Sequence, residues 1–130
     1  ESITCDRIMA WNIYHKEFIK YEHQNIVQRP CIPPGCTHNA HMYYLLLNSE
    51  INRELFIKEM AAHSVMCVSH YVPLHSAPAL DKLKMVKVSN KLPVTDDISK
   101  RLVRLPLWIG IESNIDIVLN AFTQVINLFT

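Results

Sequence analysis

The hydrophobic positions near the C-terminal end fall on one helical stripe. Apolar side chains recur there at i, i+3, i+4 and i+7 spacing, the pattern of an amphipathic helix. They are Ile115, Val118, Leu119, Phe122, Val125, Ile126 and Phe129. Ser113 and Asp116 resemble a capping box at the start of this helix. We expect the stripe to pack against a core.

Three earlier segments also have helical character. Residues 6–26 carry spaced apolar side chains among charged ones and no Gly or Pro, which predicts a long helix before Pro30. Residues 51–63 repeat the helical spacing with Phe56, Ile57, Met60 and Ala61. A short helix is expected to start at Thr95, because its hydroxyl can cap free amides and acids follow it, and to end by Leu102 or Val103.

Short apolar runs between these segments predict strands. The runs are Met42–Leu47, Val65–Val72, which Pro73 stops, and Arg104–Trp108. Pro30 and the Pro33-Pro34-Gly35 cluster force a turn, and the lysine-rich stretch from Pro78 to Pro93 is expected to be a loop. Two or three strands alternating with helices predict an α+β fold: a two-layer sandwich of a small, mainly antiparallel sheet with helices on one face.

Composition narrows the class of protein. With 130 residues, of which 49% are hydrophobic, the chain has the length and apolar content of one folded domain. The net charge of +1, with acids and bases evenly mixed, provides no basic stripe for nucleic acid. The longest apolar run is interrupted by Asn120, Thr123 and Gln124, so we expect no membrane span, and no signal peptide is found.

Four cysteines are too few for a secreted disulfide scaffold, so reduced thiols are expected. A zinc site built on Cys31, Cys36, His38 and His41 is an alternative, because four possible ligands fall within eleven residues. The stiff proline turn and the apolar strand that His41 precedes favour a loop with a buried thiol instead. We therefore predict no metal.

Catalytic motifs are scarce. Two glycines exclude a glycine-rich phosphate loop, and neither a nucleophile elbow nor a paired-carboxylate site is present. His70 and His75 flank Pro73 and, with Tyr71, could present imidazole and phenol groups to an anionic or hydroxyl-rich ligand. The alternative is that both histidines are ordinary exposed loop residues.

Three stretches carry a resemblance to a known family. They are Asn39-Ala40-His41-Met42, His70-Tyr71-Val72-Pro73-Leu74-His75 and Arg101-Leu102-Val103-Arg104-Leu105-Pro106. In order and spacing the chain resembles the C-terminal part of sugar-nucleotide aminotransferases, which depend on pyridoxal phosphate. The segment between Pro78 and Thr95 does not follow the family pattern.

The resemblance implies a fold-type-I enzyme that moves an amino group, usually from glutamate, onto a nucleotide-linked 4-keto sugar. It implies that residues 1–30 form an interdomain linker helix and residues 31–130 a C-terminal small domain, with the Schiff-base lysine in a large domain that this chain lacks. None of its eight lysines lies in a matching motif, so we assign no catalytic and no cofactor-binding residue. His70, Tyr71 and His75 are implied to border the sugar-nucleotide site, in a cytoplasmic homodimer.

Alternatives remain for the other candidates. Arg101 and Arg104 either clamp a phosphate or carboxylate or form a structural ion pair with Asp96, Asp97 or the large domain, and we favour the ion pair. An aromatic group on the first helix, Trp11, Tyr14 and Phe18, is expected to be partly uncovered in this chain. A stand-alone binding module of the same fold is the alternative to a transaminase domain.

Overall fold

Helices and short strands alternate along the chain, and a computed structural model describes residues 2–79 and 91–130. In order, the elements are α1 (Ser2–Glu17), α2 (Ile19–His23), β1 (Val27–Gln28), β2 (Tyr43–Leu47), α3 (Arg53–Ala62), β3 (Val68–Ser69), the 3₁₀ turn η1 (Leu74–Ser76), α5 (Pro93–Arg101), β4 (Leu102–Leu105), the 3₁₀ turn η2 (Ile111–Asn114) and α6 (Ile115–Ile126). None of the helices in this described part is long and apolar enough to cross a bilayer.

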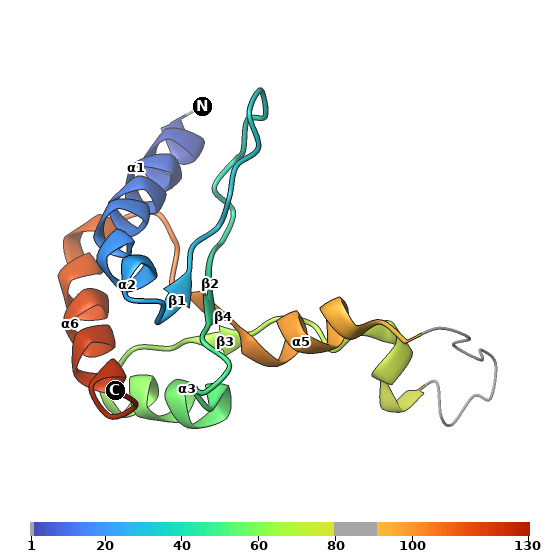
Figure 1. Cartoon of the computed structure of the whole chain (residues 1–130). Helices are drawn as coiled ribbons and strands as arrows, with labels where there is room; N and C mark the ends of the chain where they lie inside the picture. Colours follow the sequence, from blue (N-terminus) through green and yellow to red (C-terminus); the bar gives the residue numbers. More distant parts are fainter. Residues whose placement is uncertain (1, 80–90) are drawn as a thin grey trace.

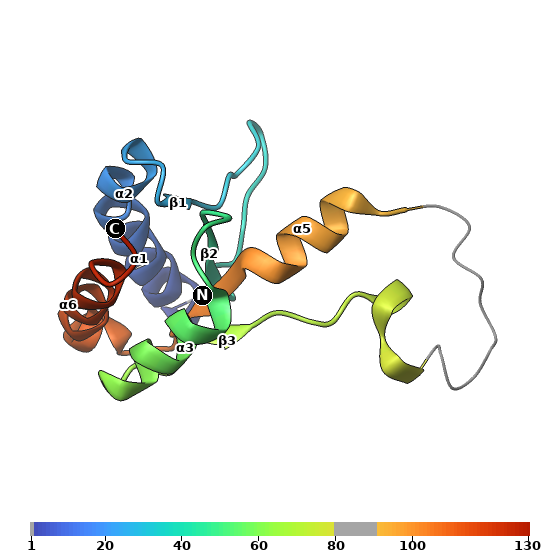
Figure 2. The same cartoon turned by 60° about the horizontal axis from the view of Figure 1, so that its bottom comes forward.

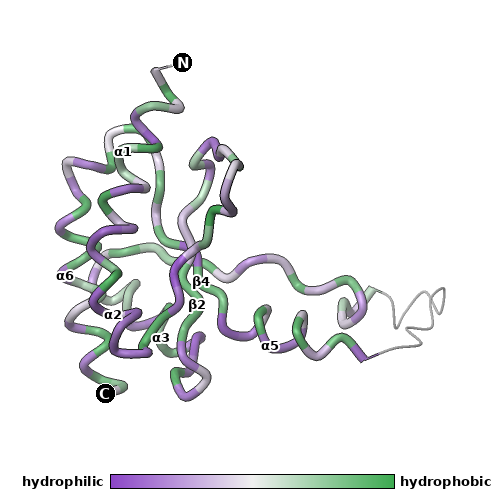
Figure 3. The backbone as a smooth tube through the Cα atoms, turned by 45° about the horizontal axis from the view of Figure 1, so that its top comes forward, coloured by the Kyte–Doolittle hydropathy of each residue, from purple (hydrophilic) through white to green (hydrophobic). Residues whose placement is uncertain are grey.

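The four strands form one antiparallel sheet in the order β1-β2-β4-β3. Tyr43 of β2 pairs with Leu105 of β4, and Leu45 pairs with Val103. These alternate positions are buried against the helices, whereas the positions between them are only half-buried, because successive side chains of a strand point to opposite faces. Hydrophobic β2 and β4 lie at the centre of the molecule (Figure 3). The predicted α+β architecture is confirmed.

Aromatic side chains join the N-terminal helix to the sheet and to the last helix. The Tyr43 ring lies 5.1 Å from that of Tyr14, and the Phe18 ring lies 4.8 Å from that of Phe122 in α6. The expectation that Trp11, Tyr14 and Phe18 would be partly uncovered is therefore wrong, since all three are buried. The chain covers them itself, because α1 and α6 lie side by side against the sheet (Figure 1).

A projection extends from this body, and we call it the arm. It consists of residues 70–79, which follow β3, and α5, and the two run side by side away from the other helices (Figures 1 and 2). His75 in η1 and Asp96 in α5 join its two halves, with 2.7 Å between Nε2 and Oδ1. The loop expected from Pro78 to Pro93 falls mostly on residues 80–90, which lie outside the described residues.

Several predicted boundaries need correction. The helix expected over residues 6–26 is two helices, which meet at Phe18 and end at His23, and β1 follows unpredicted. The strand expected over residues 65–72 is reduced to Val68–Ser69, because β4 offers pairing partners only to these two residues. The strand expected over residues 104–108 is β4, which begins earlier, at Leu102, because Leu102 already pairs with Leu46 of β2. It ends at Leu105, since Pro106 has no amide hydrogen with which to continue the ladder.

The expected helix starts also differ. The helix predicted to start at Thr95 begins at Pro93, whose fixed φ suits a first turn, and no side chain caps it. The capping box of Ser113 and Asp116 is not formed, because the turn η2 precedes α6 and puts Asn114 at the cap position. The buried stripe of α6 is confirmed.

Candidate functional site

The end of β3 brings two predicted site residues together. Val68 and Ser69 pair with Arg104 and Val103 of β4, and His70 follows immediately. The His70 and Tyr71 rings lie 4.6 Å apart at an angle of 56°, and Tyr71 is 81% exposed. The Nδ1 atom of His70 is buried and has no hydrogen-bond partner within residues 2–79 and 91–130. The pair therefore offers an unused nitrogen and an exposed phenol ring.

The third predicted residue, His75, contacts an acid of α5. Its Nε2 atom lies 2.7 Å from Oδ1 of Asp96, and its side chain is mostly buried. This contact uses one ring nitrogen to hold η1 against α5. His75 thus serves the arm structurally, and only its Nδ1 atom remains for a ligand.

The two arginines that sequence reasoning treated alike are in different environments. Arg101 donates from Nε to Oδ1 of Asp97 at 2.8 Å and from NH1 to the carbonyl of Leu47 at 2.7 Å. The hydrogen bond from Arg101 lowers the pKa of the Asp97 carboxyl, so both groups stay charged. The predicted structural ion pair is confirmed for Arg101.

Arg104 has no such partner. Its guanidinium makes no hydrogen bond or ion pair with any residue that the structure describes, and its Nε atom is buried. The favoured ion pair is wrong for Arg104 as far as Asp96 and Asp97 are concerned, because those acids contact His75 and Arg101. An ion pair of Arg104 with the large domain stays a prediction. Alternation along β4 could have revealed this difference: Arg104 stands between buried Val103 and Leu105 and so points to the other face.

The zinc alternative is not supported by geometry. Cys31 and Cys36 are exposed, the His38 ring packs 4.5 Å from Trp11, and His41 hydrogen-bonds to Asn39. In the part of the chain that the structure describes, no three His, Cys, Asp or Glu side chains gather as metal ligands. The buried thiol belongs to Cys67 instead of to either cysteine of the proposed loop.

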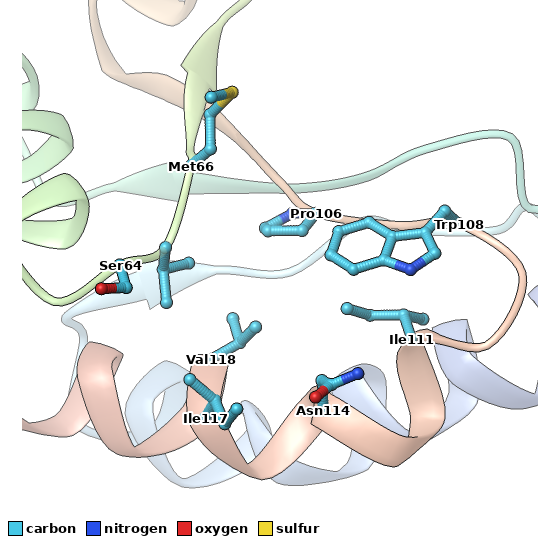
Figure 4. A pocket seen from close by; sticks show the side chains of 9 residues that line it. Ser64, Met66, Pro106, Trp108, Ile111, Asn114, Ile117 and Val118 are labelled. Carbon is cyan, nitrogen blue, oxygen red and sulfur yellow. The ribbon is translucent and has the colours of Figure 1, made fainter.

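An apolar cavity of about 380 Å³ lies between α6, η2 and the segment before β3. Val118 and Ile111 point from the helical side toward Pro106 and Trp108 (Figure 4). Ser64 and Asn114 are the uncharged polar residues in its wall, and no titratable side chain lines it. It can accommodate an apolar surface but has no group for acid–base chemistry. Sequence reasoning missed it, since its wall comes from segments far apart in the chain.

The described lysines do not fit a pyridoxal phosphate site. A Schiff-base lysine is activated by desolvation in a pocket or by a neighbouring cation. Every described lysine is exposed: Lys16, Lys20, Lys58, Lys91 and Lys100. Lys82, Lys84 and Lys87 lie outside the described residues. We therefore derive no step through this cofactor from the residues of this chain.

Comparison with known proteins identifies the family. The sequence profile of the DegT/DnrJ/EryC1/StrS aminotransferase family matches residues 1–123. The chain belongs to this family. An uncharacterised protein of Methanocaldococcus jannaschii is 30% identical to this family member over 99 residues, which cover 74% of the chain and 25% of that protein. The chain thus spans about a quarter of the length of this relative.

Solved structures of aminotransferases share the fold. The aminotransferase from Psychrobacter cryohalolentis aligns with a TM-score of 0.84 at 18% identity, over 98% of this chain and 35% of its own. The sugar aminotransferase CalS13 from Micromonospora echinospora gives 0.78 at 14% identity, over 95% and 31%. NtdA from Bacillus subtilis, solved with bound pyridoxamine phosphate, gives 0.76 at 15%, over 96% and 28%. Almost the whole chain therefore matches about a third of each of these solved aminotransferases.

Proposed function

We propose that this chain acts as the C-terminal small domain of a pyridoxal phosphate-dependent transaminase. The complete enzyme would move an amino group from glutamate to a nucleotide-linked 4-keto-6-deoxy sugar. The observation that carries the proposal is that almost the whole chain aligns with only about a third of each solved aminotransferase. Exposure of all the described lysines supports a domain that is not competent alone.

The proposed division of labour follows from these residues. A large domain would provide the Schiff-base lysine, and the cofactor, when bound, acts as an electron sink. The small domain would close one side of the cleft, with His70 and Tyr71 at the end of β3 facing the sugar nucleotide and His75 holding the arm. Residues 1–30 as a linker helix, residues 31–130 as the small domain, and a cytoplasmic homodimer stay predictions.

Within the family, the sequence most resembles dTDP-4-amino-4,6-dideoxygalactose transaminase. The resemblance runs over almost the whole chain. The product would be an amino sugar for lipopolysaccharide or enterobacterial common antigen.

The coding sequence and its product test the proposal. In frame before Glu1 we expect a large domain with a Schiff-base lysine, and the purified full-length protein should convert glutamate and the nucleotide-linked keto sugar to the amino sugar. The same protein with that lysine replaced by alanine is the control and should be inactive. A gene without such a domain, or a full-length protein that binds pyridoxal phosphate but has no activity, would support a stand-alone binding module instead.

A further inference from the structure

The connection between β1 and β2, residues 29–42, is attached to α1 at two points, and we call it the strap. Near its start, Arg29 donates from NH1 to the backbone carbonyl of His15. Near its end, the ring of His38 lies 4.5 Å from that of Trp11. Most residues between these contacts are exposed, and the strap projects away from β1 and β2 (Figure 1). The two contacts therefore hold the strap against α1.

His15 takes part in both attachments. Its carbonyl accepts the hydrogen bond from Arg29, and its ring stacks on that of Trp11, with 4.5 Å between the centroids and 20° between the planes. Trp11 is buried, and the ring of Tyr43 in β2 lies edge-on to it at 5.3 Å. The indole ring thus contacts the sheet and two imidazoles, so a change at His15 reaches the contact between α1 and the strap.

The His15 ring has no acceptor for a second N–H group. Its Nδ1 atom is buried and has no hydrogen-bond partner within residues 2–79 and 91–130. A neutral imidazole carries one N–H, whereas the imidazolium form carries an N–H on each nitrogen. Protonation would therefore leave a charged, buried donor unpaired, which costs more free energy than leaving a neutral group unpaired. The closed strap thus favours a neutral His15.

The groups around His15 add to this preference. Within the described part of the chain, the ionisable side chains that face it from neighbouring elements are Arg29, Glu22, His38 and Tyr43. Burial and then the charge of Arg29 lower the pKa of His15, and His38 adds to them. Glu22 acts in the opposite direction, but its carboxylate is paired with Arg29 at 2.7 Å. Tyr43 is neutral, because burial raises its pKa.

The lowered pKa of His15 sets the direction of the pH dependence. An exposed histidine has a pKa of about 6.5, so an open form of the strap binds the proton more tightly than the closed form does. Closure is therefore complete above that ordinary pKa and is weakened as the pH falls through the lowered pKa of the closed form.

We propose that the strap opens in mild acid because His15 then takes up a proton. An imidazolium at this position repels Arg29 and lacks an acceptor, so the strap moves off α1 and Trp11 becomes exposed to water. At neutral pH the uncharged ring stacks on Trp11 again and the strap closes. This response belongs to residues of the described chain and does not depend on the proposed function.

The test uses the 130-residue chain at pH values from 8 to 5. Trp108→Phe leaves Trp11 as the only tryptophan, because the sequence has two. We expect the emission of Trp11 to shift to longer wavelength below about pH 6.5 and to return when the pH is raised. In ¹H–¹⁵N spectra, the amides of the strap should move to the positions of an unfolded chain, whereas those of β2 and β4 should keep their folded positions.

His15→Phe is the decisive variant, because phenylalanine retains an aromatic ring for Trp11 and cannot take up a proton. It should keep the strap closed down to pH 5. His15→Gln should also lack the acid transition, and the β2 and β4 amides show that each variant is folded. His38→Phe, which removes the imidazole of the strap, and His63→Gln, at an exposed histidine after α3, are the controls and should retain the transition.

Three results for the acid transition would each overturn the proposal: its absence from the Trp108→Phe chain, its persistence in His15→Phe, or its disappearance in His38→Phe. Loss of the folded β2 and β4 signals at the same pH would also overturn it, since the whole domain would then unfold instead of releasing the strap.

Discussion

Two buried tyrosines differ by one hydrogen bond. Tyr14 donates from its hydroxyl to the carbonyl of Pro106 at 3.0 Å, whereas the Tyr43 hydroxyl is buried without a partner in the described part of the chain. Burial raises the pKa of both phenols, so both are neutral over the ordinary pH range. Replacing each tyrosine by phenylalanine therefore measures what the hydrogen bond contributes to stability apart from the aromatic ring.

We expect Tyr14→Phe to lower the free energy of unfolding by about 1 kcal/mol, because it leaves the Pro106 carbonyl unpaired. Tyr43→Phe should leave that free energy unchanged or raise it, since the lost hydroxyl is unpartnered. Urea denaturation followed by circular dichroism measures both. Equal losses in the two variants would contradict the hydrogen-bond assignment.

The four thiols should differ in reactivity. Burial raises the pKa of Cys67 to about 12, whereas Cys5, Cys31 and Cys36 are exposed. Because the thiolate is the reactive form, Cys67 should be inert in the folded chain. Titration with Ellman's reagent at pH 8 should detect three fast thiols and a fourth only in denaturant. Cys67→Ala should remove that fourth thiol alone, and a fast reaction at Cys67 would contradict the packing.

At the scale of elements, one ion pair holds α1, α2 and the segment after β1 together. Arg29 donates from its backbone N and from Nε to the Glu22 carboxylate, at 2.9 and 2.7 Å, and from NH1 to the carbonyl of His15. Burial acts to raise the pKa of Glu22, but the hydrogen bonds and charge of Arg29 outweigh it and lower that pKa. The pair therefore contributes its full stabilisation above the unfolded pKa of Glu and loses it as the pH falls through the lowered pKa of Glu22 in the folded chain.

We expect Glu22→Gln to lower the free energy of unfolding by about 1–2 kcal/mol at pH 7 and by less at pH 3, because part of the wild-type stabilisation is lost once the pH lies below the unfolded pKa of Glu and falls toward the lowered pKa of Glu22. Urea titrations at the two pH values measure the difference. Glu50→Gln, at an exposed glutamate outside the described ion pairs, is the control and should have little effect at either pH. A loss for Glu22→Gln that is independent of pH would contradict the ion-pair interpretation.

Elements with their own periodicity could be predicted from sequence, and elements defined by a partner could not. The stripe of α6 repeats over several turns, so it identifies the helix without tertiary information. The strands β1 and β3 have two residues each, too few for an alternating pattern. They are strands only because they pair with β2 and β4. The same reason explains the site: adjacent His70 and Tyr71 could be found, but the His75–Asp96 contact and the isolation of Arg104 depend on pairing.

At the scale of the whole molecule, every lysine that the structure describes is exposed at the surface. With pyridoxal phosphate followed by borohydride, we expect substoichiometric labelling spread over several lysines, because no described lysine is pre-organised for imine formation. Peptide mass spectrometry measures the distribution. Complete labelling of a single lysine, with its own absorption band, would mean that this chain carries a cofactor site.

The contact between the two ends of the chain has a consequence for biosynthesis. The Tyr21 hydroxyl lies 2.7 Å from that of Thr123, across 102 residues of sequence, and the ring of Phe18 packs on Phe122. Closing so long a loop is slow and must wait until α6 exists. Until α6 has been synthesised, the aromatic side chains of α1 and of the sheet stay exposed to water and can associate with other apolar surfaces. The nascent chain should therefore depend on chaperones until α6 is available to pack on α1.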